Sequence, residues 1–91
     1  MKIGAFVPQG WRMDLNGIPI EEQWGTIIST ANNIEDLNYE SVWVYDHFHT
    51  VPKATQDPTY ECWTLMSALS QTTTKVRLGQ MCTCNSYRNP S

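Results

Sequence analysis

The sequence predicts an α/β protein in which three parallel strands alternate with two helices. Two observations support this prediction. Segments 2–8, 41–45 and 76–84 are short and mostly apolar, which is typical of strands buried on both faces of a parallel sheet. Between them lie two longer segments whose apolar residues recur every three or four positions, as on one face of a helix. The order is therefore β-α-β-α-β, with helices covering the sheet.

The first predicted strand is the segment "KIGAFVP", which spans residues 2–8 and ends at Pro8. We expect residues 9–19 to form a loop, because they are rich in residues that favour turns. These residues are Gly10, Asn16, Gly17 and Pro19.

A helix is predicted from Ile20 to about Leu37. Its apolar residues follow one another in steps of three or four, and they define the expected buried face: Ile20, Trp24, Ile27, Ala31, Ile34 and Leu37. Glu21 and Glu22 lie in the first turn, where the helix dipole favours negative charge. We expect Asn38 to end the helix.

The second predicted strand, "SVWVY" at 41–45, is followed by a loop over residues 46–56. Asp57 is the predicted N-cap of the next helix, with Pro58 at its first helical position. This helix is expected to extend over residues 58–71. Its predicted inward side consists of Cys62, Trp63, Met66 and Leu69.

The third predicted strand, "VRLGQMCTC", is followed by the loop "NSYRNP" at 85–90. The last residues, Asn89-Pro90-Ser91, have the composition expected at the start of a third helix. A sheet of three parallel strands leaves two open edges and incompletely covered helices. We therefore expect residues 1–91 to be the first part of one longer α/β domain; an eight-fold barrel needs about 250 residues.

Composition and charge narrow the class of protein. With 41% hydrophobic and 16% charged residues, the chain is neither disordered nor membrane-spanning. A formal net charge of −3 provides no basic surface for nucleic acid or an anionic membrane. The first residues, "MKIGAFVPQG", make a poor signal peptide. We expect a cytoplasmic protein with no nucleic-acid or membrane partner.

The three cysteines do not have the spacing of a structural zinc site. Cys82 and Cys84 are separated by a single residue, and Cys62 is far away in sequence. We expect them to be small buried side chains in a reducing compartment.

The candidate functional residues follow the predicted strands, because ligands of parallel α/β folds bind at the carboxyl ends of strands. Asp46 and His47 come directly after the second strand and are the leading candidates. His47 and His49 would also suit a barrel-type metallohydrolase, but the chain contains no third histidine, and no metal is predicted. In the alternative without a site, Asp46 caps the loop and His49 is a solvated loop residue.

Three motifs resemble a known family. They are "FVPQGWRMD" (6–14), "SVWVYDHFHTVP" (41–52) and "RLGQMCTCNSYRNP" (77–90). Together they are similar to the N-terminal part of the luciferase-like flavin or deazaflavin oxidoreductases, and most of all to the actinobacterial branch that uses coenzyme F420. The resemblance covers the whole chain and implies that it supplies the first three strands of a (β/α)8 TIM barrel.

The resemblance also implies site residues. In F420-using relatives an Asp-His pair after strand two faces the deazaflavin ring, which implies cofactor contacts for Asp46 and His47. His47 would be catalytic, exchanging the proton that accompanies hydride transfer. Asp46 would orient a neighbouring imidazole or bind the polar edge of the ring. A non-proline cis peptide late in strand three would fall at Met81–Cys82 and place Cys82 and Thr83 beside the ring.

The implied function is F420-dependent hydride transfer to or from a small organic substrate, with Trp11 and His49 as candidate residues on the substrate side. An FMN-dependent monooxygenase of the same family is the alternative. A metallohydrolase using His47 and His49, or a non-catalytic module, would belong to a different class. We expect the full-length protein to be a homo-oligomer, and residues 1–91 alone to be inactive and to bind no cofactor tightly.

Overall fold

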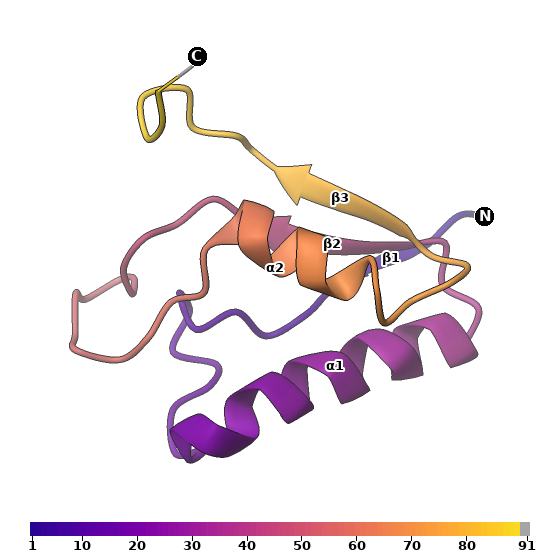
Figure 1. The fold of residues 1–91 in the computed structure, drawn as a ribbon, viewed down its shortest axis with the longest axis horizontal. Coiled ribbons are helices and arrows are strands. Elements are labelled where there is room, and N and C mark those ends of the chain that lie inside the picture. The colour runs from indigo at the N-terminus through magenta and orange to yellow at the C-terminus, as the bar shows by residue number, and fades with distance from the viewer. Residues whose placement is uncertain (90–91) are drawn as a thin grey trace.

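The computed structural model describes residues 1–89, which form three strands and two helices in the predicted order (Figure 1). The elements are β1 (Gly4–Phe6), α1 (Ile20–Asp36), β2 (Ser41–Tyr45), α2 (Cys62–Leu69) and β3 (Arg77–Met81). The strands are parallel and adjacent in the order β1-β2-β3. Successive units of a (β/α)8 barrel have this arrangement, so the predicted fold class is confirmed. Of the predicted third helix start, Pro90 and Ser91 lie outside the described residues.

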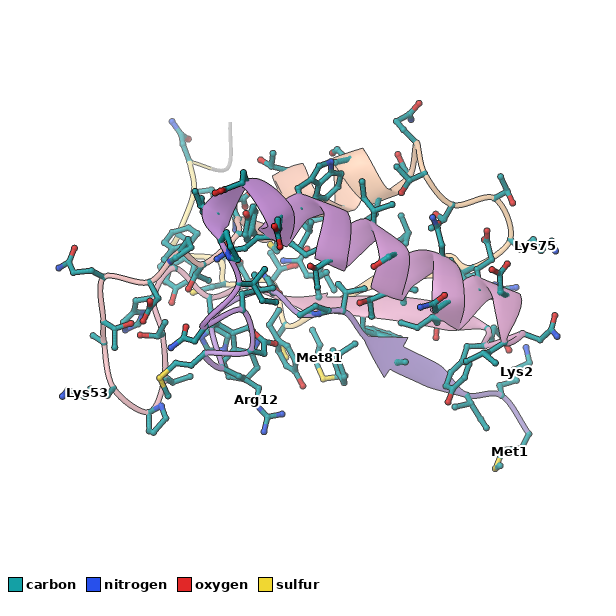
Figure 2. The ribbon with its side chains drawn as sticks, turned by 90° about the horizontal axis from the view of Figure 1, so that it is seen from below. Met1, Lys2, Arg12, Lys53, Lys75 and Met81 are labelled. Atoms are coloured by element: carbon teal, nitrogen blue, oxygen red, sulfur yellow. The ribbon has the colours of Figure 1, made fainter. Side chains whose placement is uncertain are left out.

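The two faces of the sheet differ in what covers them. Both helices pack on the same face, above the strands in Figure 2, and the side chains of Val42 and Val44 are buried there. On the opposite face Phe6 is 45% exposed and Met81 41% exposed. The prediction that every strand is buried on both faces is therefore wrong, because residues 1–89 contribute no layer over this second face.

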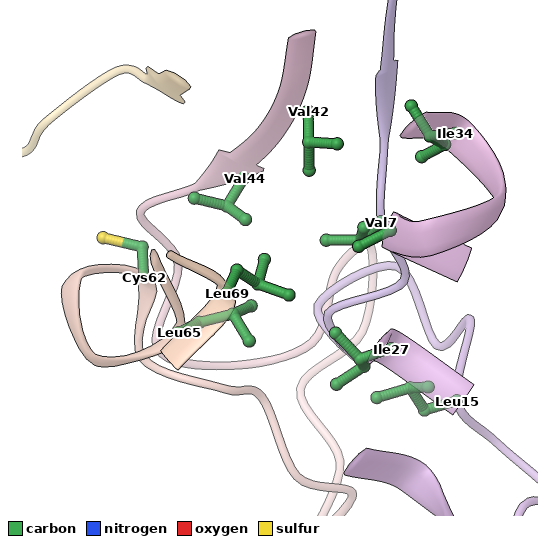
Figure 3. Packing of buried hydrophobic residues seen from close by; sticks show 10 residues of the cluster. Val7, Leu15, Ile27, Ile34, Val42, Val44, Cys62, Leu65 and Leu69 are labelled. Carbon is green, nitrogen blue, oxygen red and sulfur yellow. The ribbon is translucent and has the colours of Figure 1, made fainter. Parts of the chain in front are cut away.

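The hydrophobic core lies between the sheet and the helices (Figure 3). Burying each large aliphatic side chain contributes about 1.5–3 kcal/mol, and this is the main stabilising term of the fold. The buried apolar residues are Val7, Leu15, Ile27, Ala31, Ile34, Val42, Val44, Cys62, Leu65 and Leu69.

Helix α1 agrees with its predicted limits, but its buried face is shorter than predicted. Its middle turns supply Ile27, Ala31 and Ile34 to the core, whereas Ile20 and Leu37 are exposed. A helix of 17 residues is about 25 Å long, and a five-residue strand is about 17 Å long. The two ends of the helix therefore extend beyond the sheet that they would have to cover.

Helix α2 is shorter than predicted, and its N-cap is Glu61 rather than Asp57. The Glu61 carboxylate accepts a hydrogen bond from the backbone N–H of Thr64 at 2.7 Å. Asp57 instead accepts a hydrogen bond from the Thr55 hydroxyl at 2.7 Å, within the preceding loop. The segment before Glu61 is held extended, with the Tyr60 N–H donating to the carbonyl of Gln9 at 3.0 Å, so the helix cannot begin at Pro58.

The inward side of α2 was predicted only in part. Cys62 and Leu69 are buried as predicted, and Met66 packs partly against the core. Trp63 is exposed, and Leu65, which was not predicted, is buried instead. Cys62, Leu65 and Leu69 are three and four positions apart and lie on one face of the helix, whereas Trp63, directly after Cys62, points to another side.

The third strand ends at Met81, so residues 82–84, which were predicted to continue it, follow the strand. All three cysteines are free thiols: Cys62 is buried as predicted, Cys84 is partly buried and Cys82 is exposed. Neither helix within residues 1–89 has both the length and the apolar character needed to cross a membrane.

Candidate functional site

The segments that follow the three strands gather at one edge of the sheet, on the left of Figure 1. Gln9, which sequence reasoning missed, joins two of them. Its buried amide donates to the carbonyls of Tyr45 at 2.6 Å and Tyr60 at 2.8 Å, and its carbonyl accepts the Tyr45 N–H at 2.8 Å. A buried glutamine with a fully used amide holds the loop after β1 against the end of β2.

Four aromatic rings lie in a row along this edge. Phe6 stacks on Tyr45 with ring centroids 4.6 Å apart, and Trp11 meets Tyr45 edge-on at 4.7 Å. Trp11 then stacks on His47, with centroids 4.3 Å apart and an interplanar angle of 10°. The row therefore brings together Trp11 and His47, two candidates that the sequence placed in separate loops.

His47 is the candidate whose polar atoms are most available. Its imidazole is partly buried and lies face to face with Trp11. Within residues 1–89 neither ring nitrogen takes part in a hydrogen bond, so neither is committed to a protein partner there. His49, by contrast, is exposed, in line with a solvated loop residue.

The Asp46 carboxylate is occupied by protein donors. Arg88 donates to it with both terminal nitrogens, at 2.7 and 2.8 Å, and the Cys84 N–H donates at 2.8 Å. The Cys62 thiol donates at 3.2 Å. The hydrogen bonds from Arg88 hold the pKa of Asp46 far below its usual range, so the carboxylate is ionised. It makes no hydrogen bond to His47 within the described residues.

Arg88 also bonds the carboxylate of Glu61 at the start of α2. Burial opposes ionisation of Glu61, but the hydrogen bonds from Thr64 and Arg88 prevail and lower its pKa to about 2. Burial, together with the Asp46 carboxylate, raises the pKa of Cys62 to about 12. Cys62 is therefore a neutral thiol at physiological pH and cannot serve as a nucleophile.

A metal site receives little support from this geometry. Asp46, Glu61 and Cys62 offer ligand atoms within 4.8 Å of one another, and no other group of this kind occurs in the part of the chain that the structure describes. Both carboxylates already bind Arg88, and the group contains neither His47 nor His49. Within residues 1–89 the two histidines of the metallohydrolase alternative are not grouped with further ligand atoms.

The end of β3 presents exposed groups at the same edge. Met81 pairs with Tyr45 in the sheet register, and both Cys82 and Thr83 are exposed. The predicted cis peptide at Met81–Cys82 is wrong for this structure: within residues 1–89 the cis bond is Val51–Pro52. A non-proline cis bond costs about 3–4 kcal/mol and persists only where its surroundings impose it, whereas Met81 and Cys82 are exposed.

Flat side chains and exposed backbone at one edge suit a planar heteroaromatic ligand. Aromatic rings stack at centroid separations of about 4.5–7 Å, and the exposed faces of Phe6 and Met81 extend the surface on which a ring can lie. The free nitrogens of His47 can bind or exchange a proton with such a ligand. The residues present therefore fit a flavin or deazaflavin ring.

Fold and site together define a class, that of parallel α/β proteins whose functional groups lie where the strands end. The chain also matches the family model described as "Luciferase-like monooxygenase" over residues 1–91. It belongs to the luciferase-like monooxygenase family. A comparison with curated proteins found no match, and neither did a comparison with solved structures. Family membership indicates an oxidoreductase, and the family as a whole uses flavin or F420 cofactors.

Proposed function

We propose that the chain belongs to the F420-using branch of its family and takes part in hydride transfer between the deazaflavin and a small organic substrate. The observation that carries this proposal is the position of His47. Its imidazole lies flat on Trp11, with ring centroids 4.3 Å apart, at the edge where parallel α/β folds bind ligands. An oriented imidazole with unbonded nitrogens is suited to proton exchange at a ligand ring.

Coenzyme F420, when bound, supplies a carrier of hydride in two-electron steps. In this proposal His47 takes up or releases the accompanying proton, because a positioned imidazole can act as a general acid or base. Trp11 holds the plane of the imidazole, because the two rings are stacked with an interplanar angle of 10°. Trp11 and His49 are the residues that we place on the substrate side.

The tip of β3 would contribute the second side of the cofactor site. Met81, Cys82 and Thr83 are exposed beside the end of β2, where Tyr45 pairs with Met81. We propose that these three residues lie against the cofactor ring, opposite the loop that carries His47. The Asp46 carboxylate is already bonded to Arg88. We therefore propose that Asp46 holds this loop in place rather than contacting the ring.

An FMN-dependent monooxygenase is the second candidate, and the description of the matching family favours it. Both cofactors have a planar three-ring system, so the same edge suits either one. The two are separated by titrating the complete protein with F420 and with FMN and following absorbance and fluorescence. Tight FMN binding without F420 binding would overturn the first choice.

The role of His47 is tested by substitution in the complete protein. We expect His47→Ala to lower turnover about 10²-fold or more, the usual loss when a general acid or base is removed. His49→Ala is the comparison variant: it removes the exposed histidine of the same loop, to which we assign a place on the substrate side but no proton exchange, so we expect a smaller effect on turnover. Unchanged turnover in His47→Ala would mean that His47 lines the site without exchanging a proton.

A further inference from the structure

One guanidinium joins three segments at the carboxyl edge of the sheet. Arg88 lies in the segment that follows β3, yet its bonds go to Asp46 after β2 and to Glu61 at the start of α2. Within residues 1–89 no other side chain forms ion pairs with two carboxylates at this edge. Arg88 therefore links these three segments through its ion pairs.

The ion pair is well placed to be rigid. The Asp46 side chain is 0% exposed, and that of Arg88 is 30% exposed. Two parallel N–H···O bonds fix both the distance and the orientation of the guanidinium and the carboxylate. A buried carboxylate is tolerated only when its hydrogen bonds are satisfied, and both oxygens of Asp46 accept bonds from protein donors.

Arg88 holds the chain on both sides of His47. On one side Asp46 accepts its bidentate bond. On the other side the Phe48 ring lies under the guanidinium at 5.5 Å and stacks on Tyr87 with centroids 4.3 Å apart. The residues before and after His47 are thus both bound to the segment after β3, while the His47 ring itself lies on Trp11.

We propose that Arg88 is a positioning residue, which holds the His47 imidazole against Trp11, and that Asp46 acts through Arg88 rather than by contact with the cofactor ring. The same bonds set the position of the backbone after β3, since the Cys84 N–H also donates to Asp46. This inference rests on the proposed function, in which His47 is the group that exchanges the proton.

The test observes the His47 ring directly, in the complete protein without cofactor. In the NMR spectrum of the histidine Cε1–H groups, the ring current of Trp11 should shift the His47 signal upfield. His47→Gln and His49→Gln assign the two signals of residues 47 and 49, and Trp11→Leu should abolish the upfield shift. These variants establish the readout before Arg88 is changed.

Arg88→Gln should then move the His47 signal towards the position seen in Trp11→Leu, and Arg88→Lys should do so in part, because lysine keeps the charge but not the paired bonds. Arg77→Gln is the matched control: Arg77 is the first residue of β3, its side chain is 79% exposed, and it pairs loosely with Glu40 at 3.8 Å. It should leave the His47 signal unchanged.

An unchanged His47 signal in folded Arg88→Gln or Arg88→Lys would overturn the proposal. Loss of the folded state in both Arg88 variants would also overturn it, because Arg88 would then be needed for stability as a whole. Failure of the proposed function would show itself separately, as absence of cofactor binding in the unsubstituted protein, since no cofactor enters the NMR experiment.

Discussion

At the scale of single residues, the size of Trp43 determines which residues fit beside it on the neighbouring strands. Its indole lies across the face of the sheet away from the helices and donates to the Ser41 hydroxyl at 2.8 Å. A Cβ at Gly4 would lie 2.6 Å from the indole nitrogen, and a Cβ at Gly79 would lie 2.6 Å from the six-membered ring. Glycine on both flanking strands therefore leaves the space that the indole fills.

We expect Gly79→Ala to destabilise the protein by about 1–3 kcal/mol, the usual cost of overpacking a filled space. Gly25→Ala is the control, since a Cβ there meets nothing within 4 Å and replaces glycine inside helix α1. It should stabilise the protein by about 0.5–1 kcal/mol. Urea unfolding of the three proteins measures both differences, and equal stabilities of the two variants would contradict the account.

At the scale of elements, the end of α1 shows how one residue stops a helix. Asn38 adopts a left-handed conformation with φ 60°. Its N–H donates to the carbonyl of Glu35 at 3.0 Å, and the Tyr39 N–H donates to the carbonyl of Ile34 at 3.1 Å. These two bonds form a Schellman motif, which satisfies the last helical carbonyls and turns the chain towards β2.

The left-handed conformation of Asn38 predicts how substitutions at this position change the stability of the protein. Asn38→Ala should lower the free energy of unfolding by about 1 kcal/mol, because alanine is unfavourable in the left-handed region. Asn38→Gly should be neutral or stabilising, since glycine adopts this conformation freely. Asn33→Ala, at an exposed position inside the same helix, is the control and should not destabilise. Thermal melting would contradict this account if alanine and glycine behaved alike at position 38.

At the scale of the whole molecule, carboxylates connect elements that are distant in sequence. Glu35, near the end of α1, accepts hydrogen bonds from the backbone N–H groups of Lys75, Val76 and Thr74, which lead into β3. Those bonds lower the pKa of Glu35 from its ordinary 4.5 to about 2. Glu61 has the same lowered pKa at the opposite end of the sheet.

The pH dependence of stability follows from the sign of these shifts. A carboxyl group whose pKa is lower in the folded state stabilises it fully above the unfolded value, here 4.5, and this contribution is lost as pH falls towards 2. We expect the free energy of unfolding to fall steeply over this range. Glu35→Gln should be less stable than the unsubstituted protein at pH 7 and should lose less stability on acidification. Parallel curves for the two proteins, measured by urea unfolding at a series of pH values, would exclude Glu35 as a source of the effect.

The sequence by itself determined the order of the elements, the limits of α1 and β2 and the residue that ends α1. Those features depend on neighbours a few positions apart: the three-to-four spacing of apolar residues in α1, the apolar run of β2, and the tolerance of Asn38 for a left-handed conformation. It also indicated which loops hold candidate residues, since parallel strands end at the same edge.

Only the tertiary structure decided which of those residues meet. The bonds between Arg88 and Asp46 join positions 42 residues apart, and the amide of Gln9 bonds the carbonyl of Tyr60 across 51 residues. The start of α2 also depended on such a contact, because the segment before Glu61 is bonded to Gln9 rather than free to continue the helix. Local patterns carry no information on partners at these separations, since the partners are chosen by the packing of the sheet and helices as a whole.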